Sequence, residues 1–465
     1  MLDLLVRNGT VVTAEGSYPY DVAIQGGKVA AIGPHGTLGE AKETVDAAGK
    51  LVLPGLIDPH VHIHHPFKGS FAGDDFTSAT RSAAFGGVTT VCDFAIQWDK
   101  TKSLTDTCAL RKSQFEGQSI TDYAFHACLT RSDAETIGEL PGLIQGGIPS
   151  AKLYMTYSRQ GRMSDDAALY EALRLTAQYG GIVGVHAEND AMCYYFSDAF
   201  KAAGKTSPHY FPLCKHNLVE SEAVNRAIYL AKVTGGNLYI FHLSCKESLD
   251  ILRKAQDEGV HVYAETCIHY LTMDMSQYDR PDGANFICSP PLRSKADVEA
   301  LWQGIQEGRI GVVSSDHCGF TLANKATGGN DFTATPNGLP GMETRLPALY
   351  TYGVKAGRIS LSKMVELLSA NPARAFGMYP RKGTLAPGSD GDLVIFDPSE
   401  EKVISPAVLH SPVDWNPFDG QTLSGFAQAV YLAGKPIIQD GACLAAPGTG
   451  KFVRRDAKAI CIFDR

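Results

Sequence analysis

Between residues 51 and 315 the chain repeats one pattern, a short apolar run without polar alternation followed by a segment with helical periodicity. Apolar runs of this kind are typical of parallel strands that are buried on both faces, and such strands need crossover connections between them. The pattern occurs eight times, which predicts an α/β fold built on a closed (β/α)8 barrel of the TIM type. The expected barrel strands are 51–57, 88–94, 123–129, 151–155, 182–186, 238–243, 260–266 and 310–315.

The segments between the expected strands carry signals for the start and the end of helices. Serine at a helix N-terminus accepts a hydrogen bond from a free backbone N–H, and glycine commonly follows the last helical residue. On this basis Ser164, Ser221 and Ser294 are predicted to cap three helices, each of which stops at a glycine. A last barrel helix is expected over 360–370, with the following Asn-Pro pair ending it or marking a bend.

Both ends of the chain consist of short strand-like runs separated by glycine turns. We expect the two ends to pair into one small β-sandwich beside the barrel. The predicted domains are 1–54 for the N-terminal part of the sandwich, 55–380 for the barrel, and 381–465 for the C-terminal part of the sandwich and a tail. Strands are expected within 4–13, with a turn at Asn8-Gly9, and within 21–32, with a turn at Gly26-Gly27. The other expected strands are 44–53, 392–396, 402–404, 429–432, 436–438 and 451–453.

Length and composition exclude several classes of protein. A chain of 465 residues suits one large domain plus a smaller one, and 44% apolar with 20% charged residues is typical of a soluble globular protein. The net charge of -8 is mild and argues against a nucleic-acid partner. The sequence has neither an apolar window of about eighteen residues nor a signal-peptide pattern, so no membrane span is expected. The eleven cysteines stand singly, without a Cys-x-x-Cys pair, which favours a reducing cytoplasm.

Two histidines stand two residues apart near the end of the first expected strand. Because positions i and i+2 of a strand face the same side, His60 and His62 are predicted to lie side by side. Two neutral imidazoles in this arrangement can begin a transition-metal site, although a His-x-His pair alone is also compatible with surface or packed histidines.

Further candidate ligands come at the ends of later strands. His186 ends the fifth expected strand, His242 lies near the end of the sixth, and Asp316 directly follows the eighth. Each has an alternative role when considered alone, which is a core position for either histidine and helix capping for the aspartate. In a barrel of this type functional side chains project from the C-terminal ends of the strands. The sequence therefore predicts that these residues converge with His60 and His62 on a metal site.

Lys152 lies in the fourth expected strand, whose buried face would not accept an unpaired ammonium group. A cation beside metal ions would also repel them. A neutral lysine amine can take up carbon dioxide and become a carbamate, which is an anion with two oxygen atoms. Such a carbamate, N6-carboxylysine, could bridge two metal ions.

These motifs together resemble those of the amidohydrolase superfamily, and specifically its dihydropyrimidinase and D-hydantoinase group of cyclic amide hydrolases. The resemblance covers nearly the whole chain. The segments that carry it are Asp58-Pro59-His60-Val61-His62 with Pro66-Phe67, Lys152 to Tyr157, His186-Ala187-Glu188-Asn189, His242-Leu243-Ser244, Glu265-Thr266-Cys267, Ser289-Pro290-Pro291-Leu292-Arg293, Ser315-Asp316-His317 and Asn337-Gly338.

The resemblance implies a barrel with a β-sandwich made from both termini, and a pair of divalent metal ions, most commonly zinc. It also implies a division of the ligands between the two ions. The first metal would be held by His60, His62 and Asp316, the second by His186 and His242, with carboxylated Lys152 between them.

The resemblance assigns further roles at the substrate. Tyr157 matches a tyrosine that stabilises the oxyanion, and Ser289 and Asn337 match positions whose backbones hold the cyclic amide. Homo-oligomers, either tetramers or dimers, are expected.

The predicted activity is metal-dependent hydrolysis of the cyclic amide bond of 5,6-dihydropyrimidines or 5-substituted hydantoins to N-carbamoyl amino acids. Two metals that share one water lower its pKa from about 16 toward 7, which yields a bridging hydroxide at neutral pH. This hydroxide would attack a ring carbonyl, while Tyr157 donates to the oxyanion. Asp316 would carry the proton of the water to the ring nitrogen.

Other functions stay open as alternatives. In dihydroorotases an arginine that grips the substrate carboxylate stands where this chain has His64, so its absence counts against an acidic ring substrate. An allantoinase is a further relative, and a mononuclear deaminase would not need Lys152. Some relatives of dihydropyrimidinase are non-catalytic scaffold proteins that have lost metal ligands, whereas all six positions are occupied here. A serine hydrolase is disfavoured because the sequence has no Gly-x-Ser-x-Gly motif.

Positions that decide substrate preference differ from the family pattern. His65 stands where the family often has a methionine near the exocyclic substituent of the substrate, and Tyr154 and Gln160 are further candidates for this pocket. For His317, helix capping and support of the metal ligands are both open.

Overall fold

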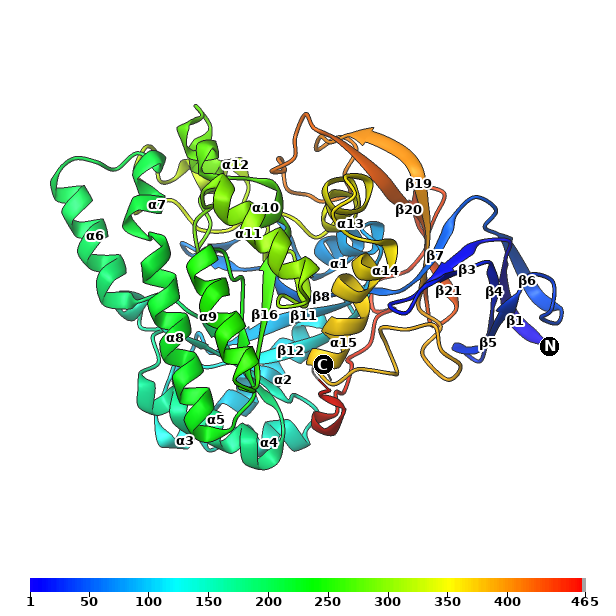
Figure 1. The fold of residues 1–465 in the computed structure, drawn as a ribbon, viewed down its shortest axis with the longest axis horizontal. Helices are drawn as coiled ribbons and strands as arrows, with labels where there is room; N and C mark the ends of the chain where they lie inside the picture. The colour runs from blue at the N-terminus through cyan, green and yellow to red at the C-terminus, as the bar shows by residue number, and fades with distance from the viewer. Residues whose placement is uncertain (462–465) are drawn as a thin grey trace.

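The computed structural model describes residues 1–461, and its largest part is a barrel of parallel strands surrounded by helices (Figure 1). The barrel strands pair with their neighbours in chain order, and every one of these pairings is parallel. This confirms the predicted (β/α)8 architecture. The strands are β8 (Leu56–His62), β11 (Val88–Ile96), β12 (Asp122–Cys128), β13 (Ser150–Tyr154), β14 (Ile182–His186), β15 (Leu238–Ile240), β16 (Val262–Cys267), β17 (Val312–Ser314) and β18 (His317–Cys318).

The eighth barrel strand runs in two pieces, and these join it to both of its neighbours. Its first piece, β17, pairs with β16, and its second piece, β18, pairs with β8, so the last strand meets the first. At this seam the buried guanidinium group of Arg345 donates hydrogen bonds to the carbonyl oxygens of Ile57 (2.9 Å) and Val313 (3.1 Å). Asp316 lies between the two pieces, at the C-terminal mouth of the barrel.

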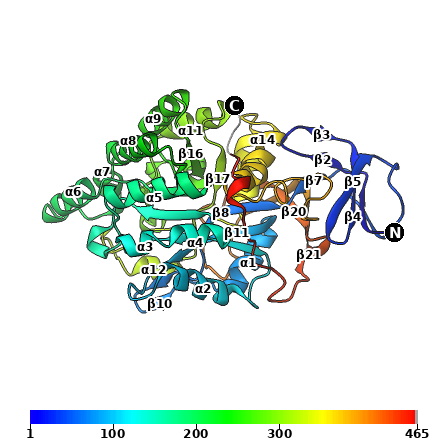
Figure 2. The same cartoon turned by 90° about the horizontal axis from the view of Figure 1, so that it is seen from below.

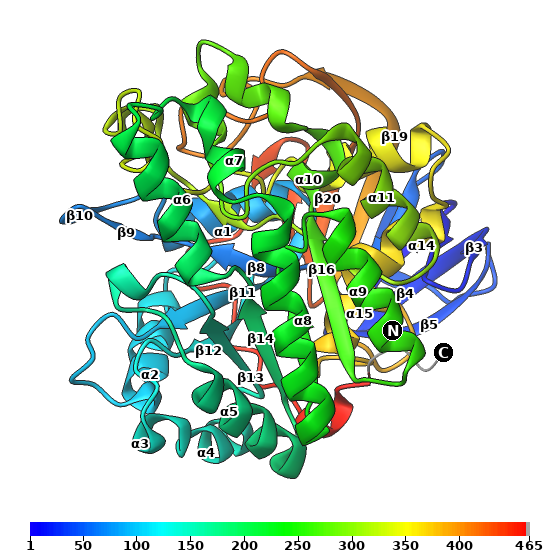
Figure 3. The same ribbon diagram turned by 60° about the vertical axis from the view of Figure 1, so that its left-hand side comes forward.

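Helices cover the outside of the barrel, as Figure 3 shows for α5, α8 and α9. The longest helix, α8, buries Ala223, Ala227 and Ala231, which lie on one face because they are four residues apart. None of the helices in residues 1–461 combines the length and the apolar character that crossing a membrane requires. The helices are α1 (Phe76–Phe85), α2 (Leu104–Phe115), α3 (Ala134–Ile137), α4 (Leu140–Gln145), α5 (Asp166–Tyr179), α6 (Asp190–Ala202), α7 (Phe211–Cys214), α8 (Asn217–Thr234), α9 (Lys246–Asp257), α10 (Ile268–Thr272), α11 (Lys295–Gln306), α12 (Leu322–Ala326), α13 (Arg345–Leu349), α14 (Leu361–Val365) and α15 (Asn371–Ala375).

Of the three predicted serine caps, one is correct. Ser294 caps α11 in a capping box with Asp297. The helix α5 begins one residue later than predicted, because the carboxylate of Asp165 rather than Ser164 accepts the hydrogen bond from the N–H of Ala168 (2.8 Å). The prediction for Ser221 is wrong, since this residue lies inside α8, which begins four residues earlier.

The predicted last helix over 360–370 continues past its Asn-Pro pair. It begins as α14 with a cap from Ser360, passes through the π-helical segment η6 (Glu366–Ala370), and goes on as α15. Pro372 follows the π-helical segment as the second residue of α15. The other short helical segments are η1 (Ser158–Gln160), η2 (Pro208–Tyr210), η3 (Met275–Asp279), η4 (Gly283–Phe286), η5 (Tyr350–Lys355) and η7 (Ala457–Ala459).

Strands from both ends of the chain form the predicted sheet-rich part beside the barrel. Figure 2 shows the N-terminal strands next to β7, β20 and β21, at the opposite side of the molecule from α6, α8 and α9. A four-stranded sheet has the order β5-β4-β1-β6, and a seven-stranded sheet has the order β22-β21-β20-β19-β7-β2-β3. Their strands are β1 (Leu2–Arg7), β2 (Thr10–Val12), β3 (Ser17–Tyr18), β4 (Tyr20–Gln25), β5 (Lys28–Pro34), β6 (Ala41–Asp46), β7 (Leu51–Pro54), β19 (Leu393–Val403), β20 (Thr422–Leu432), β21 (Lys435–Gln439) and β22 (Ala442–Cys443). A separate hairpin of β9 (Pro66–Phe67) and β10 (Ser70–Phe71) follows the first barrel strand.

The two terminal sheets share one apolar core, as a sandwich requires. It contains Val6 and Ile24 from the four-stranded sheet together with Val52, Ile395 and Tyr431 from the seven-stranded sheet. The predicted barrel strand 51–57 was wrong at its start, because β7 pairs with β19 in the sandwich and only β8 enters the barrel. The predicted strands 392–396 and 402–404 are the two ends of one strand, β19.

The prediction of a strand over 451–453 is also wrong, because these residues, which the structure describes, form no strand. In this segment Phe452 makes a single isolated bridge to Tyr123 of the barrel strand β12. The next residues hold the tail against the barrel. The guanidinium group of Arg454 donates a hydrogen bond to the carbonyl oxygen of Gly146 (3.1 Å). The backbone N–H of Asp456 donates one to the carbonyl oxygen of Gly377 (3.0 Å). The last four residues of the predicted C-terminal segment 381–465 lie outside the described residues.

Candidate metal centre

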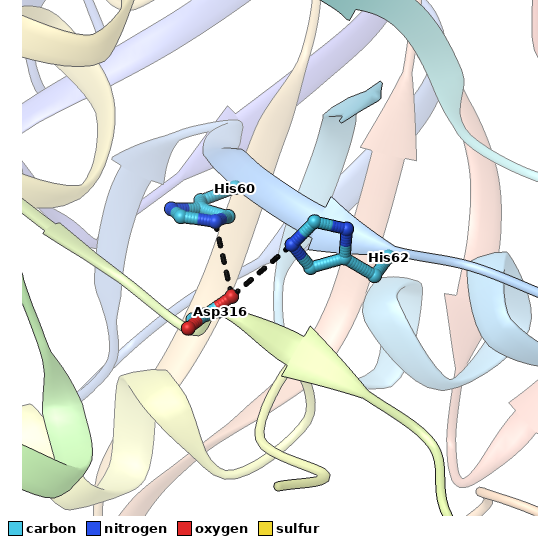
Figure 4. A group of neighbouring side chains, drawn as sticks. All are labelled: His60, His62 and Asp316. Carbon is cyan, nitrogen blue, oxygen red and sulfur yellow. Dashed lines mark ion pairs between the residues drawn. The ribbon is translucent and has the colours of Figure 1, made fainter. Parts of the chain in front are cut away.

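Three predicted metal ligands come together at the C-terminal mouth of the barrel. His60 and His62 lie at the end of β8 with their ring centroids 5.3 Å apart. Their Nε2 atoms lie 3.0 Å and 3.4 Å from Oδ1 of Asp316, and Figure 4 shows both imidazoles turned toward this carboxylate. One ligand atom from each of the three residues lies within 4.8 Å of the other two, so one ion can contact all three.

A buried glutamate orients the first of these imidazoles. Nδ1 of His60 is paired with Oε1 of Glu265, which lies on β16, and the other carboxylate oxygen accepts a hydrogen bond from the hydroxyl of Tyr239 (3.1 Å). With Nδ1 engaged in this way, Nε2 of His60 is directed toward Asp316. An acidic partner of this kind raises the basicity of a ligating histidine and fixes its tautomer. Glu265 stands in one of the segments that carry the family resemblance, but the sequence did not assign it a role.

Lys152 lies in the same buried group. It is 1% exposed, and its Nζ atom is 3.3 Å from Nε2 of His60. Below it are aromatic rings of the barrel interior, with the centroids of Phe94 and Phe241 4.0 Å and 4.6 Å from Nζ. Burial lowers the pKa of Lys152, although the nearby Asp316 and Glu265 carboxylates act in the opposite direction. The amine is therefore more easily neutral, and so more nucleophilic, than that of an exposed lysine.

His186 and His242 form a second pair of imidazoles beside the first. Their ring centroids are 4.5 Å apart, and the ring of His242 is 5.4 Å from that of His60. Nε2 of His186 lies 2.7 Å from Oε2 of Glu188, a carboxylate that was not predicted as part of the site. Burial lowers the pKa of His242 well below its ordinary value, and the neighbouring His186 lowers it further.

The donor set fits divalent metal ions. Burial lowers the pKa of His62 to about 3, so its imidazole is neutral and keeps a lone pair for a metal. Its buried Nδ1 atom is among the side-chain nitrogens of residues 1–461 that have no hydrogen-bond partner. Imidazole nitrogens combined with a carboxylate oxygen are ligands that zinc accepts at about 2.0–2.2 Å. Residues from β8, β13 and β14 and from the ends of the sixth and eighth strands thus form a candidate site for metal ions.

The predicted substrate-binding residues line the same cavity, which has a volume of about 570 Å³. Its wall contains His62, Lys152, His186, His242 and Asp316, together with Tyr157, Ser289 and Asn337.

Tyr157 and the loop at Asn337 have unusual backbone geometry. Tyr157 has a φ of 71°, and its ring centroid is 5.1 Å from that of His186. Burial raises the pKa of the Tyr157 phenol to about 12. The residue after Asn337 must be glycine, because Gly338 has a φ of 143° and a Cβ atom there would come within 2.7 Å of Cβ of Cys318.

The structure also brings a buried ion pair to this wall that sequence reasoning missed. Nζ of Lys215 donates hydrogen bonds to Oε2 of Glu188 and to Oγ of Ser289, both at 2.6 Å, and Ser289 Oγ in turn donates to Glu188 (2.8 Å). Burial opposes charge on both groups, but their mutual attraction outweighs it, so the pKa of Lys215 is raised and that of Glu188 is lowered. No periodicity or motif marked Lys215, which follows α7 in the chain.

Three further histidines lie around the site and have different roles, namely His64, His65 and His317. His317 supports the loops, since its Nε2 pairs with Asp74 (2.6 Å) and its Nδ1 accepts a hydrogen bond from the N–H of Gly341 (3.1 Å), so helix capping is excluded. His64 lies outside the lining of the main cavity and stacks on Phe71, with ring centroids 3.9 Å apart. His65 does line the cavity.

Several residues around the site have left-handed backbone conformations that side chains rarely adopt. Besides Tyr157, they are His242 with a φ of 42°, Asp316 with a φ of 46° and His64 with a φ of 51°. Such conformations cost about 1–3 kcal/mol each and cluster at functional sites, where the surrounding structure maintains them. The backbone is therefore strained at Tyr157, His242 and Asp316, whose side chains line the cavity, and at His64 beside it.

The chain is similar to known proteins over almost its whole length. The Amidohydrolase family profile matches residues 51–437. The D-hydantoinase of Rhizobium radiobacter is 42% identical over 457 residues, which cover 98% of this chain and 99% of that protein. The dihydropyrimidinase structure from Brevibacillus agri has a TM-score of 0.95 at 38% identity, and the match covers 98% of this chain and 99% of that one. The L-hydantoinase (dihydropyrimidinase) structure from Arthrobacter aurescens has a TM-score of 0.92 at 32% identity, covering 98% and 100%.

Proposed function

The chain belongs to the amidohydrolase family, in its group of hydantoinases and dihydropyrimidinases, and we propose that it hydrolyses the cyclic amide bond of a 5,6-dihydropyrimidine or a 5-substituted hydantoin. The product is an N-carbamoyl amino acid. One observation carries this proposal, which is the grouping of His60, His62 and Asp316 around one point, with Lys152 Nζ 3.3 Å from His60, on a cavity large enough for a small ring.

The reaction needs two divalent metal ions, which we infer to be zinc. His60, His62 and Asp316 would hold one ion, His186 and His242 the other, and Lys152, carboxylated to N6-carboxylysine, would lie between them. The bound ions supply Lewis-acid activation of the attacking water and of the ring carbonyl. The neutral imidazoles and the lowered pKa of Lys152 support this assignment.

Asp316 acts as the proton carrier. Burial raises the pKa of Asp316, but the charge of His60 and hydrogen bonds from His60 and His62 outweigh it and hold this pKa well below its ordinary value. The carboxylate is therefore ionised at neutral pH and accepts the proton of the attacking water. It then delivers this proton to the ring nitrogen as the carbon–nitrogen bond breaks.

Tyr157 and two backbone segments hold the ring. Because the pKa of Tyr157 is raised to about 12, the phenol keeps its proton and donates a hydrogen bond to the carbonyl oxygen on which negative charge develops. The backbones at Ser289 and Asn337, which line the same cavity, bind the imide. The Lys215–Glu188 pair holds Ser289 in place.

A rate comparison tests the proposal. The purified, metal-replete protein is assayed with dihydrouracil, with 5-substituted hydantoins of each hand, with allantoin and with dihydroorotate. Hydrolysis of dihydrouracil or of a hydantoin supports the proposal. Hydrolysis of only allantoin or dihydroorotate would assign the chain to those relatives instead, and a protein that binds no metal and hydrolyses none of them would be a non-catalytic scaffold.

We also infer a cytoplasmic homo-oligomer. All eleven cysteines are free, as a reducing compartment would maintain them. One face of α8 presents Leu218, Tyr229 and Val233, which are 58%, 67% and 60% exposed and are suited to a contact between subunits. Light scattering coupled to gel filtration distinguishes a tetramer, a dimer and a monomer.

A further inference from the structure

The cavity wall carries more positive than negative side chains, and besides Lys152 the Arg162 guanidinium group is without an acidic partner among residues 1–461. Arg159 is paired with Asp198 (2.5 Å), Lys201 lies 3.6 Å from Asp331, and Lys215 is paired with Glu188. Arg162 lines the same cavity, and no carboxylate in residues 1–461 lies within 4.0 Å of its guanidinium group. A guanidinium group beside a substrate cavity without an acidic partner is available to an anion from solution.

Two aromatic rings hold Arg162 in a defined position. Its guanidinium carbon lies 4.5 Å from the ring centroid of Trp98, a contact in which a planar cation stacks on an aromatic face. The same carbon lies 5.9 Å from the ring centroid of Tyr157. Stacking leaves the N–H groups at the edge of the guanidinium plane free, and these are the groups that bind a carboxylate with two hydrogen bonds.

The backbone of the Arg162 loop is also tied down. The N–H of Arg162 donates a hydrogen bond to the carbonyl oxygen of Tyr157 (3.1 Å), and the N–H of Ser164 donates one to that of Tyr154 (2.8 Å). Between them, Met163 forms a bridge with Tyr154. These contacts anchor the loop on both sides of Arg162 and hold its backbone beside that of Tyr157.

We propose that the preferred substrates carry a carboxylate on a short substituent of the ring, and that Arg162 binds this carboxylate. This inference rests on the proposed function, since it takes the reacting imide to lie between Tyr157 and Asp316. A substituent on such a ring reaches the part of the wall where Arg162 and His65 lie. Arg162 would thus take the role of the arginine that dihydroorotases have at the position of His64. His64 itself lies outside the lining of this cavity.

The test compares two substrates of nearly equal size, hydantoin-5-acetate and hydantoin-5-acetamide, which differ in the charge of the side group. A charge-assisted pair contributes about 1.5–3 kcal/mol. The wild-type protein is therefore expected to show a kcat/KM about 10- to 100-fold higher for the acetate. In Arg162→Met this preference is lost through a rise in KM for the acetate, because the contact is equally strong in the ground and transition states. The rate with the acetamide changes less than about threefold.

Arg159→Met is the matched control, because it removes an arginine from the same wall that is already paired with Asp198. This variant should keep the preference for the acetate. The inference is overturned if the wild-type protein prefers the acetamide, or if Arg162→Met keeps the preference. A protein that hydrolyses neither compound, nor unsubstituted hydantoin or dihydrouracil, would instead refute the proposed function, so the two failures are distinguishable.

Discussion

The Nζ atom of Lys152 lies 3.3 Å from the Nε2 atom of His60, with both side chains almost completely removed from solvent. A permanent ammonium group at this place would face the His60 imidazole and the phenyl rings of the barrel interior, without a hydrogen bond to a carboxylate among residues 1–461. Carboxylation resolves this situation, because it replaces the cation with an anion that metal ions attract. The short distance between Lys152 and His60 therefore favours a carboxylated lysine at this site.

Replacing Lys152 with alanine should abolish the proper placement of both metals. We expect Lys152→Ala to lose roughly 1,000-fold or more in kcat/KM, because the metals contribute several kcal/mol to the transition state. Added acetate or propionate should restore part of the activity by standing in for the carbamate. Lys254→Ala, on the exposed side of α9, is the control and should behave as the wild type. Full activity in Lys152→Ala would refute the bridging role.

The Glu265 carboxylate should affect metal affinity rather than the fold. In Glu265→Gln the partner of His60 Nδ1 loses its charge but keeps its shape, so we expect metal affinity to fall about 10- to 100-fold. Competition with a chelator followed by metal analysis measures this change. The exposed Glu116→Gln should not alter it. An unchanged affinity in Glu265→Gln would mean that His60 does not need this partner to bind metal.

The Tyr157 phenol should act mainly on the chemical step. Removing one donor to a developing oxyanion typically costs about 100- to 1,000-fold in kcat. We therefore expect Tyr157→Phe to lower kcat by roughly this factor while KM changes only a few fold. Steady-state kinetics with dihydrouracil or a hydantoin give both constants. A large rise in KM with an unchanged kcat would show that Tyr157 only binds substrate.

Much of the barrel could be predicted because its signals are local. Apolar runs and their ends identified the strands, and the i, i+2 spacing placed His60 beside His62. The assignment of 51–57 failed because an apolar run does not reveal its partner, and β7 turns out to pair with β19 from the other end of the chain. The Lys215–Glu188 pair was missed for a similar reason, since its two side chains meet only through the packing of loops.

Lys325 should make stability depend on pH. Its buried Nζ donates hydrogen bonds to the carbonyl oxygens of Ile287 (2.7 Å) and Pro336 (2.8 Å), and burial lowers the pKa of Lys325 to about 7. In the unfolded chain a lysine pKa is about 10.4, so between about pH 7 and 10 the unfolded state binds more protons than the folded state. The free energy of unfolding should therefore rise with pH in this range.

This rise should amount to about 1 kcal/mol per pH unit from Lys325 alone. Chemical denaturation of the wild type and of Lys325→Met at about pH 7 and about pH 9, at one protein concentration, isolates this contribution. The difference in free energy of unfolding between wild type and variant should shift in favour of the wild type at the higher pH. A difference that is independent of pH would contradict the lowered pKa.

The most direct test of the whole account is an anomalous diffraction map of crystals grown from metal-replete protein. We expect two metal peaks at the C-terminal mouth of the barrel, one within about 2.0–2.2 Å of ligand atoms of His60, His62 and Asp316, and one beside His186 and His242. Density for a carboxylated Lys152 should join them. A mouth without metal peaks under these conditions, or a Lys152 side chain directed away from both histidine pairs, would contradict the proposed dinuclear hydrolase.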